Sequence, residues 1–172
     1  MDVIGGFEGT LMRLRKRLTQ LLILLLLAAA GYWVQSKRPF SRGDEISVVG
    51  VIDGDTVELE DGRRVRLIGI DTPERGELDA DSATSLTERL VLRKSVRLEF
   101  DRDQKDRYGR TLAYVYRASD GVFLNERMLI DGYANVLSIA PNVAHAEQFR
   151  AAEREARAAG RGLWTACPVE PG

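Results

Sequence analysis

Acidic residues gather in two short segments of the chain, Asp53–Thr56 and Asp71–Glu74, and Arg66 lies between them. Carboxylate and carbonyl oxygens without histidine or thiolate suit a hard cation such as Ca²⁺ or Mg²⁺. With only two or three protein ligands, water must complete the coordination shell, so we expect a weak site, toward the millimolar range. Taken singly, each segment is also typical of a solvated turn or of a helix start.

The chain contains one histidine, His145, and one cysteine, Cys167. These counts exclude an intramolecular disulfide, a cysteine-based zinc site, a histidine metal cluster and a Ser-His-Asp triad within one chain. Acid–base chemistry must therefore run on carboxylates or on metal-bound water. We assign no role to His145, which the pattern places on a helix surface.

A predicted hairpin positions the two acidic segments. Apolar residues alternate before and after Asp61-Gly62, and this dipeptide between two alternating runs is a strong hairpin signal. Pro73 cannot donate to a sheet ladder, so the returning strand is expected to end there. Arg66 and Asp71 are five positions apart and would face opposite sides of an ideal strand. A bend near Gly69 is required for both side chains to reach one pocket.

The remaining pattern predicts an α+β domain. Besides the hairpin, we expect strands at 46–52, 96–100 and 110–116, and helices at 82–93, 122–131 and 144–159. A charged loop at 101–109 precedes the last strand, and Leu163-Trp164 is expected to fold back as a hydrophobic cap.

Four groups of residues carry a resemblance to a known family. The run Val-Ile-Asp-Gly-Asp-Thr at 51–56, Arg66, Asp71-Thr72-Pro73-Glu74 and Tyr108-Gly109-Arg110 resemble the staphylococcal-type thermonucleases. The likeness extends from Ile46 to Trp164. It implies a five-stranded OB-type Greek-key barrel with three helices. It also implies Ca²⁺-dependent hydrolysis of DNA and RNA at the phosphorus–oxygen bond on the 5′ side, leaving 3′-phosphates.

The resemblance implies roles for ten residues. Asp55 and Asp71 would bind the metal together with the Thr72 carbonyl, and Asp53 and Thr56 would lie in the layer behind them. The substrate-facing residues follow from the same likeness: Arg66 and Arg110 would hold the scissile phosphate, Glu74 would act as general base or orient the water, and Arg107 and Tyr108 would contact the terminal phosphate of the substrate.

Two features depart from the family pattern. The type member carries two tyrosines on its base-binding surface, and the alignment places Ser138 and Ala140 there. Because base stacking contributes roughly 1–3 kcal/mol per base, both the affinity for single strands and the base preference stay open. The loop after Glu74 is also shorter than in the type member.

The amino-terminal part predicts a membrane segment. Basic residues at 13–17 precede an uncharged run, 18–34, rich in leucine and at the short end of what spans ~30 Å of hydrocarbon. We expect a cytoplasmic terminus (1–17), a transmembrane anchor or signal segment (18–35) and a linker (36–44). The small residues Ala28–Gly31 also permit signal cleavage and secretion.

The rest of the chain is expected to form the nuclease-like domain (45–166) and a short tail (167–172). The amino-terminal segment would place this domain in the periplasm or outside, on the inner membrane of a bacterium.

A chain of 172 residues with a net charge of −1 is not a generally basic, DNA-coating protein. Three functions stay open: a nuclease, an OB-type module that binds nucleic acid or another anion without cutting it, and a membrane-anchored structural domain. A binding module does not need the full set of Arg66, Asp71, Glu74 and Arg110, so the set favours the nuclease. The expected partners are a DNA or RNA strand and the membrane, with the protein acting as a monomer.

Overall fold

A computed structural model describes residues 17, 19–26 and 44–165. The chain divides into two compact units, Met1–Phe40 and Ser41–Gly172, and the fold below belongs to the second. In the first unit, residues 19–26 are helical. Within the described ranges, no helix has the length and apolar character needed to cross a membrane. Most of the predicted segments 1–17, 18–35 and 36–44, and the tail 167–172, lie outside the described residues.

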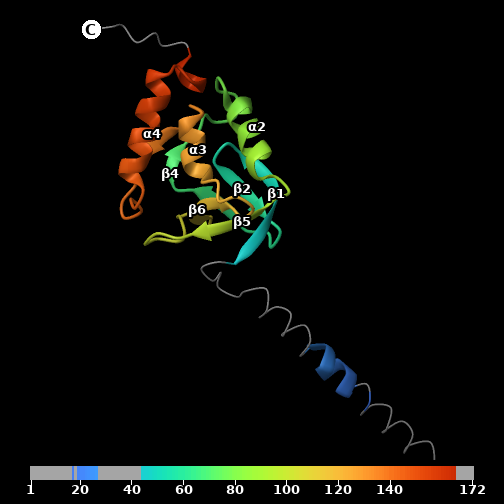
Figure 1. Cartoon of the computed structure of the whole chain (residues 1–172). Coiled ribbons are helices and arrows are strands. Elements are labelled where there is room, and N and C mark those ends of the chain that lie inside the picture. The colour runs from blue at the N-terminus through green and yellow to red at the C-terminus, as the bar shows by residue number, and fades with distance from the viewer. Residues whose placement is uncertain (1–16, 18, 27–43, 166–172) are drawn as a thin grey trace, which may run out of the picture. The chain divides into compact units, whose positions relative to one another are not determined.

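A closed barrel of five strands forms the centre of the domain (Figure 1). Its strands are β1 (Glu45–Asp53), β2 (Thr56–Leu59), β3 (Arg64–Leu67), β5 (Ser95–Glu99) and β6 (Thr111–Arg117). They neighbour one another in the order β1-β2-β3-β6-β5, and β5 closes the barrel on β1. The β3–β6 pair is parallel and the others are antiparallel. The predicted α+β fold with a five-stranded barrel is therefore confirmed.

The alternation in the sequence explains which side chains fill the barrel. Val57, Leu59, Val65 and Leu67 are completely buried, and the residues between them are more exposed, as a strand with one face on the core requires. The hairpin turn forms where it was expected, with Gly62 at a φ of +79°.

Three helices cover the barrel: α2 (Ala80–Val91), α3 (Leu124–Ile130) and α4 (Ala146–Ala158). Helix α3 packs against both α2 and α4 (Figure 1). Helix α2 begins and ends two residues earlier than predicted. It ends at Val91 because the extended Leu92 and the left-handed Arg93, with a φ of 58°, terminate it. A 3₁₀ turn, η1 (Gly162–Trp164), follows α4 and donates from Leu163 to the Gly132 carbonyl at 2.9 Å.

A second, two-stranded sheet was not predicted. It pairs β4 (Gly69–Asp71) with β7 (Asn135–Leu137) in antiparallel register, Asp71 opposite Asn135. The prediction that the returning hairpin strand runs on to Pro73 was wrong, because β3 ends at Leu67 and the chain leaves the barrel. Gly69 adopts a φ of +82°, and a Cβ there would meet the Phe149 ring at 2.5 Å. The turn therefore requires glycine for both its backbone angle and its contact with α4.

Candidate active site

The turn between β1 and β2 carries Asp53 and Asp55. Gly54 packs so closely that a Cβ there would lie 2.7 Å from the Thr72 hydroxyl oxygen. Its carbonyl also accepts a hydrogen bond of 2.6 Å from the buried Thr87 hydroxyl of α2. The turn is thus fixed against both α2 and the segment after β4, so the two acidic segments of the sequence come together.

The Asp55 carboxylate is buried and accepts several hydrogen bonds. Thr72 donates to Oδ2 from its backbone N–H at 3.1 Å and from its hydroxyl at 3.2 Å. The Thr56 hydroxyl donates to Oδ1 at 3.1 Å. The Asp53 carboxylate holds the turn from its other side, accepting from the Asp55 N–H at 3.1 Å. Thr56, Thr72 and Asp53 therefore all bear on the position of Asp55.

Burial raises the pKa of Asp55 to about 6, and the nearby Asp53 carboxylate adds to this rise. The Arg66 guanidinium lowers the same pKa but does not overcome the desolvation. Asp55 is thus a buried carboxylate whose negative charge is incompletely compensated by the surrounding protein. Additional positive charge beside it would be stabilising.

Arg66 lies between the two predicted metal-binding carboxylates. Its Nε is 3.0 Å from Asp55 Oδ1 and its Nη2 is 2.8 Å from Asp71 Oδ1. Its Nη1 donates to two backbone carbonyls, those of Leu67 at 2.6 Å and Ile70 at 2.8 Å. Three of the five guanidinium N–H groups donate hydrogen bonds and Nε forms an ion pair with Asp55, which leaves one N–H on Nη2 for a further ligand. Asp71 itself is half exposed, with 52% of its side chain accessible.

Arg110 is positioned by Asp106, a residue to which the sequence analysis gave no role. Asp106 Oδ2 is 2.6 Å from Arg110 Nε, and Oδ1 accepts the backbone N–H groups of Tyr108 and Arg110, each at 2.9 Å. Although burial raises its pKa, the hydrogen bonds from Arg110 and these amides lower it overall. An aspartate four positions before an arginine, with glycine in the intervening turn, is the local pattern that would have indicated this clamp.

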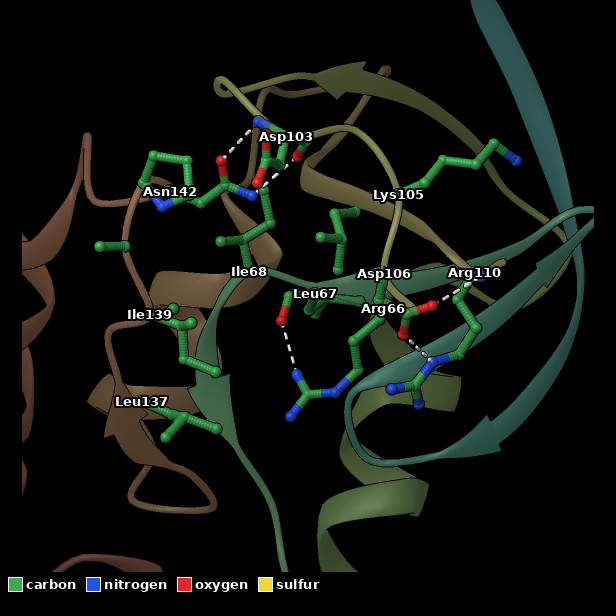
Figure 2. A pocket seen from close by; sticks show the side chains of 14 residues that line it. Arg66, Leu67, Ile68, Asp103, Lys105, Asp106, Arg110, Leu137, Ile139 and Asn142 are labelled. Atoms are coloured by element: carbon green, nitrogen blue, oxygen red, sulfur yellow. Dashed lines mark hydrogen bonds and ion pairs between the residues drawn. The ribbon is translucent and has the colours of Figure 1, made fainter. Parts of the chain in front are cut away.

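Both arginines line one hollow of about 310 Å³ (Figure 2). Arg66 and Arg110 project into it from the barrel side, and Leu137 and Ile139 face them from the segment that begins with β7. Lys105 lies on the rim beside Arg110. One wall of the hollow therefore carries three cations with the carboxylates of Asp103 and Asp106, and the facing wall is apolar. This arrangement suits a ligand with a phosphate and a flat or apolar part.

Of the two positions expected to replace the family's tyrosines, Ala140 lines the hollow and Ser138 does not. The Ser138 hydroxyl oxygen is buried without a hydrogen-bond partner among the described residues, so Ser138 points away from the hollow. Leu137 and Ile139 are exposed and line the hollow beside Ala140. Alternation along an extended segment explains why Ser138 faces away from its two neighbours, whereas Ala140 lies in the turn that follows Ile139.

Arg107 and Tyr108 come together with Arg110 next to this hollow. Arg107 Nη2 donates to the Tyr108 hydroxyl at 2.6 Å, and its guanidinium carbon lies 4.8 Å from the centre of the Tyr108 ring. The Arg110 guanidinium carbon is 5.6 Å from the same ring. Tyr108 is 68% exposed, so its ring and two cations are available to a ligand.

Glu74 is the one predicted catalytic residue that the structure does not bring into contact with the others. It is exposed after β4, and its backbone N–H donates to Glu77 at 2.8 Å. Within residues 44–165, its carboxylate forms no hydrogen bond or ion pair with another candidate residue. Glu74 nevertheless follows Asp71 by three positions and remains free to turn toward solvent.

The donor chemistry fits a hard cation, although the described residues contain no group of three or more His, Cys, Asp or Glu side chains able to hold a metal ion. Asp55 and Asp71 both contact the Arg66 guanidinium, so their carboxylates face a common region. Only oxygen donors are present there, and the negative charge of Asp55 is incompletely compensated by the surrounding protein. Two carboxylates with a backbone carbonyl and water suit Ca²⁺.

Known proteins resemble this chain over the same region. Residues 64–166 match the family model described as Staphylococcal nuclease homologue. A thermonuclease of Staphylococcus hyicus is 35% identical over 127 residues, which cover 69% of this chain and 74% of that protein. A thermonuclease of Staphylococcus intermedius is 36% identical over 132 residues, with 72% and 77% covered. The endonuclease YncB of Bacillus subtilis is 36% identical over 125 residues, with 66% and 58% covered.

Proposed function

The chain belongs to the staphylococcal nuclease family, and from this premise we propose that it hydrolyses phosphodiester bonds within DNA and RNA in a calcium-dependent reaction. It is a thermonuclease-like nuclease, a phosphodiesterase hydrolase. The bond broken is the phosphorus–oxygen bond on the 5′ side, so one product carries a 3′-phosphate and the other a 5′-hydroxyl. We class the barrel as OB-type and the enzyme as an endonuclease that works as a monomer, since one chain supplies every residue of the site.

The observation that carries this proposal is the position of two arginines on one wall of a hollow, with Arg66 paired to the buried Asp55 and the half-exposed Asp71. A phosphodiester bears one negative charge, and the pentacoordinate transition state bears more. Cations fixed before the reaction stabilise that added charge without reorganising during it. Arg66 and Arg110 are each fixed by carboxylates, at 3.0 Å from Asp55 and 2.6 Å from Asp106.

The two arginines have different roles in this proposal. Arg110 is held through its Nε and keeps both terminal nitrogens for the phosphate, so it can bind two phosphate oxygens. Arg66 offers one remaining N–H, and it also keeps Asp55 and Asp71 in place. Arg107 and Tyr108 would contact the terminal phosphate from the rim.

Asp55, Asp71 and the Thr72 carbonyl would hold a calcium ion, with Asp53 and Thr56 orienting Asp55 from behind. The raised pKa of Asp55, caused first by burial, supports a cation at this position. Bound calcium supplies positive charge that neutralises a phosphate oxygen and orients the group. Because few protein ligands are available, binding would fall in the millimolar range.

Glu74 would accept the proton of the attacking water, or orient that water. Its support is its exposed carboxylate, which is not engaged by another candidate residue in the described part of the chain and which follows Asp71 after a short turn. Two other carboxylates line the hollow, those of Asp103 and Asp106, and Asp106 is engaged by Arg110. Glu74 is preferred as the base because it follows the proposed calcium ligands Asp71 and Thr72 directly in the chain.

We also propose that the amino-terminal segment tethers the domain to the inner membrane of a bacterium. The support is the sequence alone: basic residues at 13–17, the uncharged run 18–34 and the polar linker 36–44. The catalytic domain, 45–166, would then lie in the periplasm or outside. Cleavage near Ala28–Gly31 would give a secreted enzyme instead.

The deciding experiment measures cleavage of single-stranded DNA by the full chain with millimolar Ca²⁺ and again with a chelator. We expect cutting only with Ca²⁺, and 3′-phosphate ends on the products. Cutting that persists in chelator would overturn the metal dependence. A folded chain that binds the strand but does not cut it, whichever divalent cation is added, would favour the binding module.

The roles of Glu74 and Arg66 are tested by substitution. Glu74→Gln and Arg66→Ala should each lower kcat by about 10²-fold or more at unchanged secondary structure. Glu88→Gln is the matched control, since this exposed glutamate lies on α2 outside the hollow. Equal activity of Glu74→Gln and Glu88→Gln would remove Glu74 from the mechanism.

A further inference from the structure

A second hollow, of about 670 Å³, adjoins the proposed active site on the side of the β2–β3 hairpin. Lys105 and Arg110 line both hollows, so the two adjoin at these side chains. Figure 2 shows both residues at the edge of the first hollow. The hairpin contributes Arg63 and Arg64 to the second hollow, together with Glu58.

The second hollow, called the hairpin groove below, is lined by more cations than carboxylates. Arg63, Arg64, Lys105 and Arg110 line it together with Glu58, and Asp61 and Asp106 pair with two of these arginines. The whole chain has a net charge of −1, so this is a local concentration of positive charge. Clefts lined by one sign of charge focus the electrostatic potential and attract a ligand of the opposite sign.

The cations stand on rigid elements. Asp61 holds Arg63 through its backbone N–H at 3.0 Å and its Nε at 2.6 Å. Arg64 is exposed at the first position of β3, opposite Glu58 in the strand register. Arg63 and Arg64 belong neither to the proposed scissile-phosphate site nor to the proposed calcium site.

We propose that the hairpin groove binds backbone phosphates of the substrate strand beyond the scissile one. The inference rests on the proposed nuclease function and specifies its substrate as a polynucleotide that continues past the active site. A line of cations that continues from Arg110 fits a ligand with repeated negative charges, and a single phosphate ester would leave the groove unused. Contacts to backbone phosphates carry no sequence information, so the groove would add affinity without sequence preference.

The test compares cleavage of a trinucleotide and a dodecamer of single-stranded DNA by the full chain with Ca²⁺. Arg64→Gln should lower kcat/KM for the dodecamer by about three- to ten-fold and leave the trinucleotide unchanged. Glu58→Gln should raise kcat/KM for the dodecamer, because it removes the carboxylate of the groove. Arg154→Gln is the matched control: it removes the same charge from an exposed site on α4 and should leave both substrates unchanged.

Salt dependence separates a phosphate contact from a general loss of fold. The logarithm of dodecamer affinity falls with the logarithm of salt concentration, and Arg64→Gln should reduce that slope by about 0.7 per lost contact. An unchanged slope, or an equal loss on both substrate lengths, would overturn the groove. If the wild type cleaves both substrates and Arg64→Gln has no effect, the proposal for the groove is overturned and the nuclease function stands.

Failure of the nuclease function has a different signature. If the wild type cuts neither substrate, fluorescence anisotropy with the labelled dodecamer in chelator still tests the groove. Weaker binding by Arg64→Gln than by Arg154→Gln would support it there, and equal binding would overturn it.

Discussion

Arg66 Nη2 lies 2.8 Å from Asp71 Oδ1, although the two residues are five positions apart and would face opposite sides of a straight strand. The contact exists because the chain turns at Gly69, leaves the barrel and pairs with β7 as a new strand. The same guanidinium holds Asp55 from the other end of the hairpin. The proposed site therefore depends on one backbone turn as much as on its charged residues.

The turn at Gly69 is open to a direct test. Gly69→Ala should destabilise the domain by about 2 kcal/mol or more, because alanine is strained at a φ of +82° and its Cβ would meet Phe149 at 2.5 Å. Urea unfolding followed by circular dichroism measures this change. Activity should also fall, because Arg66 and Asp71 would separate.

Gly121→Ala is the matched control for this prediction. Gly121 has a φ of +71°, but a Cβ there meets nothing within 4 Å. It should lose only about 1 kcal/mol, from the backbone strain alone. Equal losses at the two glycines would show that the contact with α4 contributes nothing.

Arg110→Ala should reduce kcat/KM by about 10²- to 10³-fold, because it removes the cation proposed to bind the scissile phosphate. Arg154→Ala, on the exposed face of α4, should retain wild-type activity. Asp106→Asn should show an intermediate loss, since Asp106 holds Arg110 at 2.6 Å. Steady-state kinetics on single-stranded DNA measures all three, and full activity of Arg110→Ala would refute the proposed phosphate grip.

The carboxylate of Asp101 should make stability depend on acid pH. Burial raises its pKa, but hydrogen bonds from the Ala144 amide at 3.0 Å and the Tyr114 hydroxyl at 3.1 Å lower it overall. A depressed pKa in the folded state adds stability above the ordinary value of 3.8, and that stability is lost as the pH falls through the folded pKa. Asp101→Asn should therefore be less stable than the wild type at pH 7, by about 1 kcal/mol.

The difference should shrink as the pH falls below about 4, measured as urea midpoints at several pH values. Asp103→Asn is the control in the same loop. The backbone of Asp103 pairs with Asn142, whereas its carboxylate forms no hydrogen bond or ion pair within residues 44–165. A difference in stability between Asp101→Asn and the wild type that stays constant with pH would contradict the depressed pKa of Asp101.

The apolar wall of the hollow should govern the affinity for bases. Ile139 is 63% exposed and faces Arg66 across the hollow, so Ile139→Tyr should tighten binding of a single strand through stacking. One stacked base contributes about 1–3 kcal/mol, or roughly five-fold or more in Kd. Ser138→Ala should leave affinity unchanged, because its hydroxyl is buried away from the hollow. An effect at Ser138 and none at Ile139 would reverse the orientation described for this segment.

Local patterns in the sequence predicted most strands of the barrel and the hairpin that carries Arg66 between the two acidic segments. The alternation around Asp61-Gly62 predicted the hairpin, because strand periodicity and turn chemistry depend on adjacent residues. The strands near 46–52, 96–100 and 110–116 were predicted for the same reason. The family motifs led to the nuclease assignment, which the comparisons with known nucleases confirm.

What only the tertiary structure decided are the contacts between segments distant in the sequence. The β4–β7 sheet joins residues more than sixty positions apart, and no local periodicity marks Asn135–Leu137 as a partner of Gly69–Asp71. This pairing decides that Leu137 and Ile139, rather than Ser138, face the arginines. The hairpin groove likewise exists only because the charged loop folds beside β3. Residue types determine the available chemistry, but long-range pairing determines which side chains share one space.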